Sequence, residues 1–377
     1  MKILLTTSFY PPYHIGGACT HVKYLAECLV QEGHDVHVLT SLDSYYFKRE
    51  RVVKIVEDNG VKIHWMKSPL DIFEPILNYS FQTMPHTYNY FKKLIKKENF
   101  DIVHHHNISL LGPKILKKIG DYKNIYTAHD YWLICPKYDL LKNGKVCLSR
   151  KNCILCCLKH KKPFPLMDIN KYIKDLDYII SPSEYLAEKL KTLGKVKNNI
   201  KVINNFVPNY SKNLNSSGYK DYFLFVGQLE TLKGIIPLIS LFKKIDKKIV
   251  VAGVGSLEKE IISISKKYKN IIYLGFLDKN NIYGLMKNAN ALILPSQWPE
   301  NNSMVIIESY MLDTPAIASN LGGNPELIEM LDKDLCFQWN DFNQLKKIIM
   351  NFDKKKYKNI PKLDFQKYYK KYKVLIK

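Results

Sequence analysis

Short apolar runs alternate with amphipathic segments along the first half of the chain. The apolar runs predict strands at residues 2–8, 35–41, 61–67, 100–106, 124–130 and 178–183. Between several of them, apolar residues recur at helical spacing and predict helices at residues 20–33, 91–98 and 112–120. Alternation of strand and helix at this period indicates a parallel, doubly wound sheet.

The same alternation restarts after a polar segment that is rich in Asn and Ser. The second half predicts strands at residues 222–227, 248–253, 271–275, 290–296 and 315–319. Helices are predicted between them, at residues 234–245, 257–268, 280–289 and 303–312. We therefore expect two Rossmann-like α/β domains, 1–183 and 184–355, with a cleft between them that faces the carboxyl ends of both sheets.

The end of the chain, residues 356–377, is predicted to hold a short, basic, amphipathic helix. Its apolar positions suggest that it packs back on the N-terminal domain. The whole chain has 377 residues, which is ample for two domains.

No apolar run approaches the roughly 18–20 residues that cross a bilayer, and the first apolar run is too short for a secretory signal. The sequence therefore predicts a cytoplasmic protein.

The net charge is +22, which directs attention to acidic partners. No zinc-finger spacing, aromatic RNA-binding pattern or basic heptad region is present, so we expect no nucleic-acid partner. Two explanations stay open: a solvated lysine-rich surface, or contact with an anionic membrane through the basic, aromatic residues 44–54 and 86–100, at the inner face of the membrane.

Two carboxylates flank an apolar run in the segment PENNSMVIIE, residues 299–308. Pro299 blocks helix before that point, and Ser303 or Asn302 is a suitable N-cap for the helix that follows. Glu300 is then expected in a loop, Glu308 inside the helix, and free backbone N–H groups between them form an anion site. The alternative is a loop glutamate and a solvent-facing helix glutamate with no shared role.

Other polar and glycine residues stand at the predicted strand ends. Lys233 lies at a strand-to-helix turn, where it can meet a diphosphate, and His129 with Asp130 ends a first-domain strand. Glycines at such turns allow a ligand to approach the backbone closely: Gly16, Gly17, Gly227, Gly253, Gly255, Gly322 and Gly323.

Together these motifs resemble family 4 of the retaining, nucleotide-sugar-dependent glycosyltransferases ("glycosyl transferases group 1"). The resemblance runs from Gly16 to Glu326, and its strongest motif is E-x7-E, which Glu300 and Glu308 match. It implies the GT-B architecture of two facing Rossmann-like domains, the first binding the acceptor and the second the donor.

The resemblance also implies a role for each matching residue. Glu308 would bind the nucleotide ribose, Glu300 would lie by the donor sugar, and Lys233 would stabilise the leaving diphosphate. The catalytic group is expected to be His129, Lys233 and Glu300. The donor-binding residues are expected to be Gly16, Gly17, Gly227, Gln228, Gly253, Asn301, Asn302, Ser303, Met304 and Glu308.

Two positions depart from the family pattern. Gln228 stands where the family commonly has an arginine, which removes one positive charge from the phosphate site. Phe206 replaces the glycine that usually follows the linker asparagine. No catalytic metal is expected, because the D-x-D at Asp175 and Asp177 precedes a strand instead of ending one.

A cysteine-rich insert, residues 135–160, follows the His129 strand. Its spacing predicts a structural metal site with zinc ahead of an iron–sulfur cluster, held by Cys135, Cys147, Cys153 and Cys156. Buried free thiols are the alternative.

The sequence thus predicts a retaining, hexosyltransferase-like enzyme that moves a sugar from a nucleotide-sugar donor to a sugar or lipid-linked acceptor. Synthesis of cell-surface polysaccharide, glycolipid or protein glycan is the expected setting. The alternatives are a GT-B enzyme of other chemistry, such as a sugar-nucleotide epimerase or a phosphorylase, and a basic nucleic-acid-binding protein.

Overall fold

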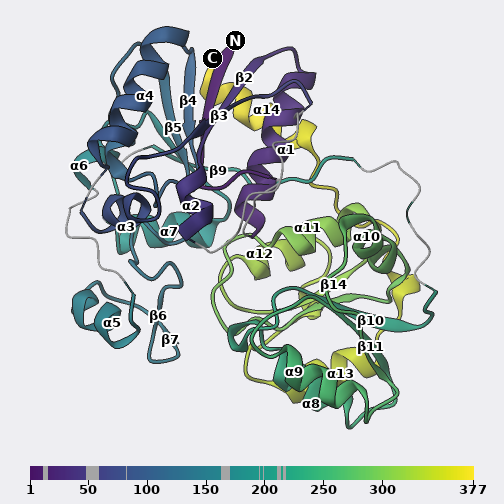
Figure 1. Ribbon diagram of the computed structural model, residues 1–377. Coiled ribbons are helices and arrows are strands. Elements are labelled where there is room, and N and C mark those ends of the chain that lie inside the picture. The colour runs from purple at the N-terminus through teal and green to yellow at the C-terminus, as the bar shows by residue number, and fades with distance from the viewer. Residues whose placement is uncertain are drawn as a thin grey trace. The chain divides into compact units, whose positions relative to one another are not determined.

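The computed structural model divides into two compact units (Figure 1). Unit 1 comprises Met1–Asn204 and Phe365–Lys377, and unit 2 comprises Asn205–Asp364. The structure describes residues 1–11, 16–47, 59–81, 83–162, 170–194, 196–197, 199–209, 214 and 218–377.

Unit 1 is built on a parallel sheet in the strand order β3-β2-β1-β4-β5-β8-β9. The strands are β1 (Lys2–Thr6), β2 (Asp35–Ser41), β3 (Lys62–Met66), β4 (Ile102–His105), β5 (Lys123–Thr127), β8 (Tyr178–Ser181) and β9 (Ile200–Val202). Every residue of β4 is buried, as expected for a parallel strand that is covered on both faces. Helices therefore flank both sides of this sheet.

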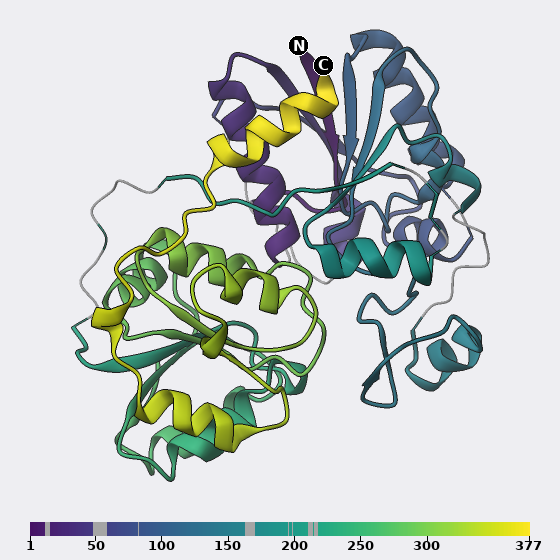
Figure 2. The same cartoon turned by 180° about the vertical axis from the view of Figure 1, so that it is seen from behind.

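The helices of unit 1 are α1 (Gly17–Gln31), α2 (Leu42–Phe47), α3 (Phe73–Ser80), α4 (Pro85–Glu98), η1 (Pro113–Leu116), α5 (Cys153–Lys159), α6 (Asn170–Ile173), α7 (Glu184–Thr192) and α14 (Phe365–Ile376). A separate antiparallel hairpin joins β6 (Leu141–Lys142) to β7 (Lys145–Val146). The closing helix α14 lies beside α1 (Figure 2), where Gln366 donates to Glu32 at 2.8 Å.

Unit 2 repeats the same plan, with a parallel sheet in the order β12-β11-β10-β13-β14-β15. Its strands are β10 (Tyr222–Val226), β11 (Lys248–Ala252), β12 (Ile271–Tyr273), β13 (Leu292–Leu294), β14 (Ala316–Ser319) and β15 (Cys336–Phe337). Its helices are η2 (Thr231–Lys233), α8 (Ile235–Phe242), α9 (Glu258–Ser265), α10 (Lys279–Asn288), α11 (Met304–Met311), α12 (Asn324–Glu329), η3 (Lys333–Leu335), α13 (Phe342–Met350) and η4 (Lys354–Lys356).

The structure differs from the expected organisation at three places: the border between the two units, the start of the closing helix, and one predicted helix of unit 1. Residues 184–204 belong to unit 1, because β9 pairs with β8 and extends that sheet by one strand. The closing helix begins at Phe365, with the residues before it in unit 2. The helix expected at residues 112–120 is a single 3₁₀ turn, η1.

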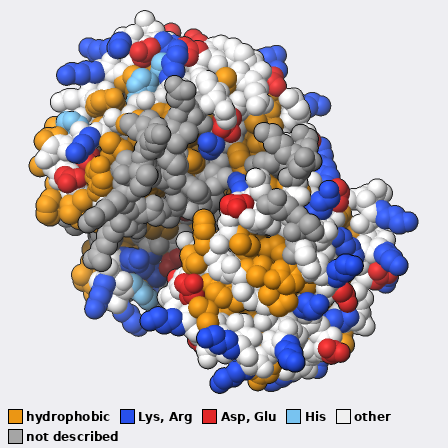
Figure 3. All heavy atoms as spheres, turned by 45° about the vertical axis from the view of Figure 1, so that its right-hand side comes forward, with side chains coloured by type: hydrophobic (Ala, Val, Ile, Leu, Met, Phe, Trp, Pro, Cys, Tyr) orange, Lys and Arg blue, Asp and Glu red, His pale blue; other side chains and the backbone are white. Residues whose placement is uncertain are grey.

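Two features bear on membrane contact: how charge is distributed over the surface, and whether a helix is apolar enough to cross a bilayer. On the face in Figure 3, Lys and Arg side chains are scattered among Asp and Glu side chains instead of forming one block. In the described part of the chain, no helix is both long and apolar enough to cross a bilayer.

Candidate functional site

The strand order of unit 2 reverses between β10 and β13, and the best candidate site lies at that point. In a doubly wound sheet, the loops that leave the two strands at this reversal diverge and leave a crevice at their carboxyl ends. Lys233 lies in the loop after β10, and Glu300 lies in the loop after β13. The Lys233 Nζ donates to Glu300 Oε1 at 2.6 Å, so the reversal brings these two predicted residues together.

Glu300 is held by three donors. Besides Lys233, the Ser296 hydroxyl and the Trp298 indole N–H each donate to the same carboxylate oxygen at 2.9 Å. The Trp298 ring lies 5.0 Å from Lys233 Nζ, which places the cation over an aromatic face. The side chains of Lys233 and Glu300 are 24% and 12% exposed, so both remain within reach of a ligand.

Two glycines fix the position of the loop that carries Glu300. Gly234, at φ +69°, lies against the loop so closely that a Cβ there would come within 1.9 Å of the Pro295 carbonyl oxygen. Gly322, at φ +70°, would bring a Cβ within 2.0 Å of the Glu300 carbonyl oxygen. The Gly323 N–H also donates to that carbonyl at 2.6 Å. The loop is therefore clamped between two close backbone contacts.

We expect Gly234→Ala to destabilise unit 2 by about 3 kcal/mol or more, because it combines a positive φ with a backbone clash. Gly275→Ala is the matched control, since Gly275 has φ +71° and a Cβ there meets only ordinary contacts. That control is expected to cost about 1 kcal/mol. Urea unfolding of the two variants measures the difference, and equal costs would contradict the clamp.

The amino end of α11 lies directly after this loop. Ser303 occupies the N-cap position but makes no side-chain capping bond, and its hydroxyl donates instead to Asn324 Oδ1 at 2.7 Å. Ser303 is therefore the N-cap residue, as expected, but its side chain does not cap the helix. Asn302 accepts from the Asn205 backbone N–H at 2.9 Å, which ties the linker asparagine to the site. The Ser303 side chain thus leaves the first backbone N–H groups of this helix uncapped, and such groups can bind an anion.

Glu308 lies on α11 in a different environment. Its carboxylate accepts from the Tyr283 hydroxyl at 3.1 Å and lies 3.6 Å from Lys279 Nζ, both on α10. Burial raises the pKa of the Glu308 carboxyl, while Lys279 and the Tyr283 hydrogen bond lower it. The two glutamates therefore have separate partners, as expected from their separate predicted roles.

Of the remaining predicted donor-binding residues, two glycines lie at strand ends in unit 2. Gly227 follows β10 and Gly253 follows β11, and a Cβ on Gly253 would come within 1.9 Å of the Gly227 carbonyl oxygen. Gln228 is exposed, while Asn301 is buried and Met304 is partly buried. In unit 1, Gly16 and Gly17 are exposed at the start of α1.

His129 lies just beyond the carboxyl end of β5 in unit 1, within a group of buried histidines. Its Nε2 is 3.0 Å from His106 Nδ1, and the His21 ring lies 5.2 Å from its ring. His104 in turn bonds Thr127 at 2.7 Å and Tyr372 of α14 at 3.0 Å. The predicted catalytic histidine is thus one member of a packed cluster that also holds the closing helix.

Acid is expected to destabilise unit 1 before unit 2. Burial lowers the pKa of His129 to about 4 and of His105 to about 3, and it lowers the pKa of His21, His104 and His106 as well. These groups gain protons on unfolding, so stability is lost as pH falls below about 6.5, by about 1.4 kcal/mol per pH unit for each histidine. Asp130 opposes this loss, because burial raises its pKa to about 6.

Hydrogen exchange followed by mass spectrometry between about pH 7 and pH 5 tests this expectation, because it reports each unit separately. Unit 2 is the internal control: the last histidine of the sequence is His160, so unit 2 has none. Loss of protection in unit 2 first would contradict the prediction.

The predicted metal ligands lie in unit 1. Cys135 is buried, Cys147 Sγ bonds the Ser149 carbonyl at 3.0 Å, and Cys153 Sγ bonds the Arg150 carbonyl at 3.1 Å. Across the described ranges, no three His, Cys, Asp or Glu side chains are grouped to hold one ion. The structure therefore does not bring Cys135, Cys147, Cys153 and Cys156 together as a site, and metal binding stays a prediction that elemental analysis tests.

Several residues of the site were not predicted from the sequence. Ser296 and Trp298 lie in the same segment as Glu300, so their nearness in the chain was a usable signal. Tyr283 and Lys279 come from α10, and only the packing of α10 against α11 brings them to Glu308. No local sequence signal indicates that contact.

Comparison with known proteins places these features in context. The family model described as "Glycosyltransferase Family 4" matches residues 15–209, and the one described as "Glycosyl transferases group 1" matches residues 207–372. The chain is 28% identical to an uncharacterised 42.6 kDa protein in the cps region of Klebsiella pneumoniae, over 88% of each protein.

Two further likenesses extend the comparison. The chain is 24% identical to the Escherichia coli UDP-Gal:alpha-D-GlcNAc-diphosphoundecaprenol alpha-1,3-galactosyltransferase, over 67% of this chain and 66% of that protein. Anabaena Alr3699/HepE in complex with UDP and glucose superposes with a TM-score of 0.64 and 16% identity, over 100% of this chain and 99% of that one. This likeness confirms the predicted GT-B fold class.

Proposed function

The chain belongs to glycosyltransferase family 4, and from that premise we propose that it is a retaining enzyme which moves a sugar from a nucleotide-sugar donor to an acceptor hydroxyl. The observation that carries the proposal is the Lys233–Glu300 pair at the strand reversal of unit 2. A cation, a carboxylate and the open amino end of α11 meet there, and a nucleotide diphosphate sugar offers a matching group to each.

The three parts of the donor have distinct partners in this proposal. Lys233 and the amides at the start of α11 receive the diphosphate, since both present positive charge. Glu300 exchanges its present donors for the hydroxyls of the sugar. Glu308 accepts from the ribose hydroxyls, and Tyr283 orients its carboxylate.

The reaction needs stabilisation of separating charges. When the bond between sugar and phosphate breaks, positive charge develops on the anomeric carbon and negative charge develops on the diphosphate. Lys233 and the helix amides stabilise the diphosphate charge, and they do so more strongly in the transition state than in the bound donor. The acceptor hydroxyl attacks on the same face, and the departing phosphate takes its proton, so no protein nucleophile and no catalytic metal are required.

Two further residues have roles in this proposal. The exposed Gly16 and Gly17 at the start of α1 let the diphosphate approach the backbone. His129 contacts the donor sugar or the acceptor.

We propose a cell-surface polysaccharide, glycolipid or protein glycan as the product, made on the cytoplasmic side of a membrane. The similar Escherichia coli protein is named for an acceptor that carries a diphosphate and a polyprenyl chain. An acceptor of that class suits a protein with a net charge of +22.

A thermal-shift panel of UDP, GDP and ADP, each with and without a sugar, tests donor binding. Uridine compounds are expected to raise the melting temperature of unit 2, because a ligand that binds only the folded state adds about 2.7 kcal/mol at a concentration 100 times its Kd. UDP is the first choice because HepE binds it. Absence of a shift with every nucleotide would contradict the proposal.

A further inference from the structure

An arm on unit 1, residues 140–162, displays an unusual amount of apolar surface. It consists of the β6–β7 hairpin and α5, and Figures 1 and 2 both show these elements standing apart from the sheet of unit 1. Asn143 and Gly144 have φ +52° and +74°, the conformation of a tight two-residue hairpin turn. The sequence of this arm holds the cysteines that were predicted to bind metal.

The base of the arm is anchored in the core. Leu140 is 1% exposed and belongs to the hydrophobic core of unit 1, and the Cys147 N–H donates to its carbonyl at 2.7 Å. Cys157 on α5 is also 1% exposed. The arm is therefore held at its base and on one side of α5.

The opposite side of α5 is apolar and faces solvent. Ile154, Leu155 and Leu158 are 54%, 65% and 68% exposed, and their spacing places them on one face of the helix. Leu148, in the loop before α5, is 78% exposed. A water-facing cluster of this kind marks a binding surface.

Within the described residues of the arm, 140–162, every Lys or Arg adds positive charge and no Asp or Glu is present. Between Asp139 and Asp168 the sequence contains no Asp or Glu. The cations in the arm are all exposed: Lys142, Lys145, Arg150, Lys151, Lys159, Lys161 and Lys162.

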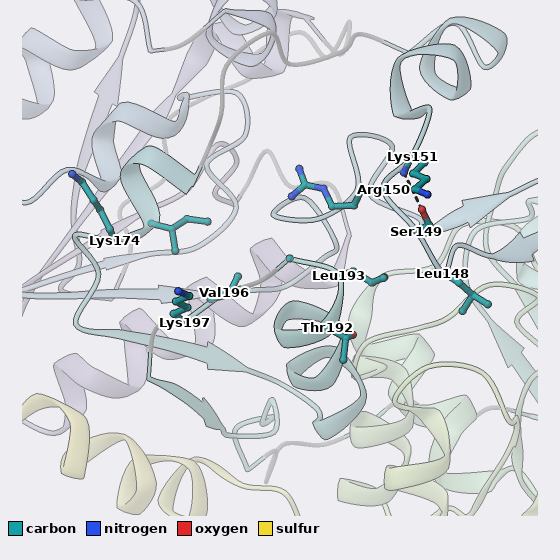
Figure 4. Close-up of a pocket in the computed structure, with 11 residues that line it drawn as sticks. Leu148, Ser149, Arg150, Lys151, Lys174, Thr192, Leu193, Val196 and Lys197 are labelled. Carbon is teal, nitrogen blue, oxygen red and sulfur yellow. Dashed lines mark hydrogen bonds between the residues drawn. The ribbon is translucent and has the colours of Figure 1, made fainter.

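The same loop forms one wall of a cavity of 960 Å³ in unit 1 (Figure 4). Arg150 and Lys151 line it from the arm. Lys174, directly after α6, and Lys197, between α7 and β9, line it from the body of unit 1. Among the described residues that line the cavity, the others are apolar or uncharged and none is Asp or Glu. The positive surface therefore continues from the arm onto the body of unit 1.

We propose that this arm docks unit 1 on an anionic membrane surface, with the apolar face of α5 inserted between lipid headgroups. Apolar side chains encircled by Lys and Arg suit the boundary between anionic headgroups and acyl chains. A second copy of the chain fits less well, because it would bring cations against cations.

The arm is a better candidate for membrane contact than the segments predicted from sequence. Helix α4 turns Phe91, Leu94 and Ile95 inward and its lysines outward, as any surface helix does. Of residues 44–54, those from 48 onward lie outside the described part of the chain. The proposal does not depend on the sugar-transfer function.

Flotation with lipid vesicles tests the proposal on the full chain. The protein is expected to float with vesicles of phosphatidylcholine containing about one third phosphatidylglycerol, and at least tenfold less with phosphatidylcholine alone. The triple variant Ile154→Ser, Leu155→Ser, Leu158→Ser is expected to lose at least tenfold of the anionic binding.

The matched control replaces three exposed apolar side chains of unit 2: Phe276→Ser, Met330→Ser and Met350→Ser. It is expected to float within twofold of the unchanged protein. A second comparison removes positive charge. The test variant carries Lys151→Gln, Lys159→Gln and Lys161→Gln in the arm. Its control carries Lys259→Gln, Lys266→Gln and Lys267→Gln, on and after α9 in unit 2. Only the variant with the arm substitutions is expected to bind anionic vesicles more weakly and to show a smaller dependence of that binding on salt concentration.

Three outcomes overturn the proposal: no flotation of the unchanged protein, equal flotation of the arm and control variants, or a dimer that only the arm triple variant disrupts. The thermal shift with UDP is measured on the same samples. It is expected to be unchanged in the arm variants, so failure of donor binding and failure of membrane docking can be told apart.

Discussion

Replacing Lys233 with alanine is expected to lower the rate of sugar transfer by about 10²–10³-fold while the protein stays folded. Lys233 is the cation nearest Glu300 at the strand reversal, and a donor that stabilises transition-state charge contributes on this scale. The effect on stability is expected to be about 1 kcal/mol or less, because both side chains of the ion pair are partly exposed. The measurement is kcat at saturating donor, with urea unfolding alongside.

Lys244→Ala supplies the control for this experiment, because Lys244 is an exposed lysine of the same unit that follows α8. It is expected to keep full activity. The assignment of Lys233 to the leaving diphosphate would be wrong if Lys233→Ala turned over at the rate of Lys244→Ala.

Glu308→Gln is expected to weaken donor binding by about 10–100-fold, which corresponds to the loss of a hydrogen bond to a charged group. The amide keeps the shape of the side chain but loses the negative charge and replaces one acceptor oxygen with an NH₂ donor. Burial raises the pKa of Glu308, so donor affinity is expected to fall on acidification at a higher pH than for an ordinary glutamate. Titration calorimetry with UDP across pH measures both effects.

Glu258→Gln is the matched control, since Glu258 also accepts a tyrosine hydroxyl, from Tyr273 at 2.7 Å, but on α9. Loss of UDP affinity in this variant to the same degree would show a general effect on unit 2. If Glu308 recognises the ribose, Glu308→Gln must lose more UDP affinity than Glu258→Gln.

Much of this protein could be predicted from the order of its residues. The buried strand β4 and the repeated strand–helix pattern are local, because each depends on apolar spacing within about ten residues. The segment around Glu300 and Glu308 was also recognisable, because its helix start and both carboxylates lie within one short stretch. Elements that depend on partners far along the chain were harder to place. For example, β9 is very short and is a strand because it pairs with β8.

The order of residues was enough to identify the two-sheet fold class and the family, and it predicted which residues carry the chemistry. Only the tertiary structure decided which of those residues meet. It brought Lys233 to Glu300, gave Glu308 its partners on α10, and enclosed His129 among other histidines. It also showed that α5 presents Leu155 and Leu158 to solvent, where the sequence had suggested a metal site. The physical reason is that spacing along a chain specifies which residue types share a helix or strand, whereas contacts between separate elements depend on how sheets order their strands and how helices pack on them.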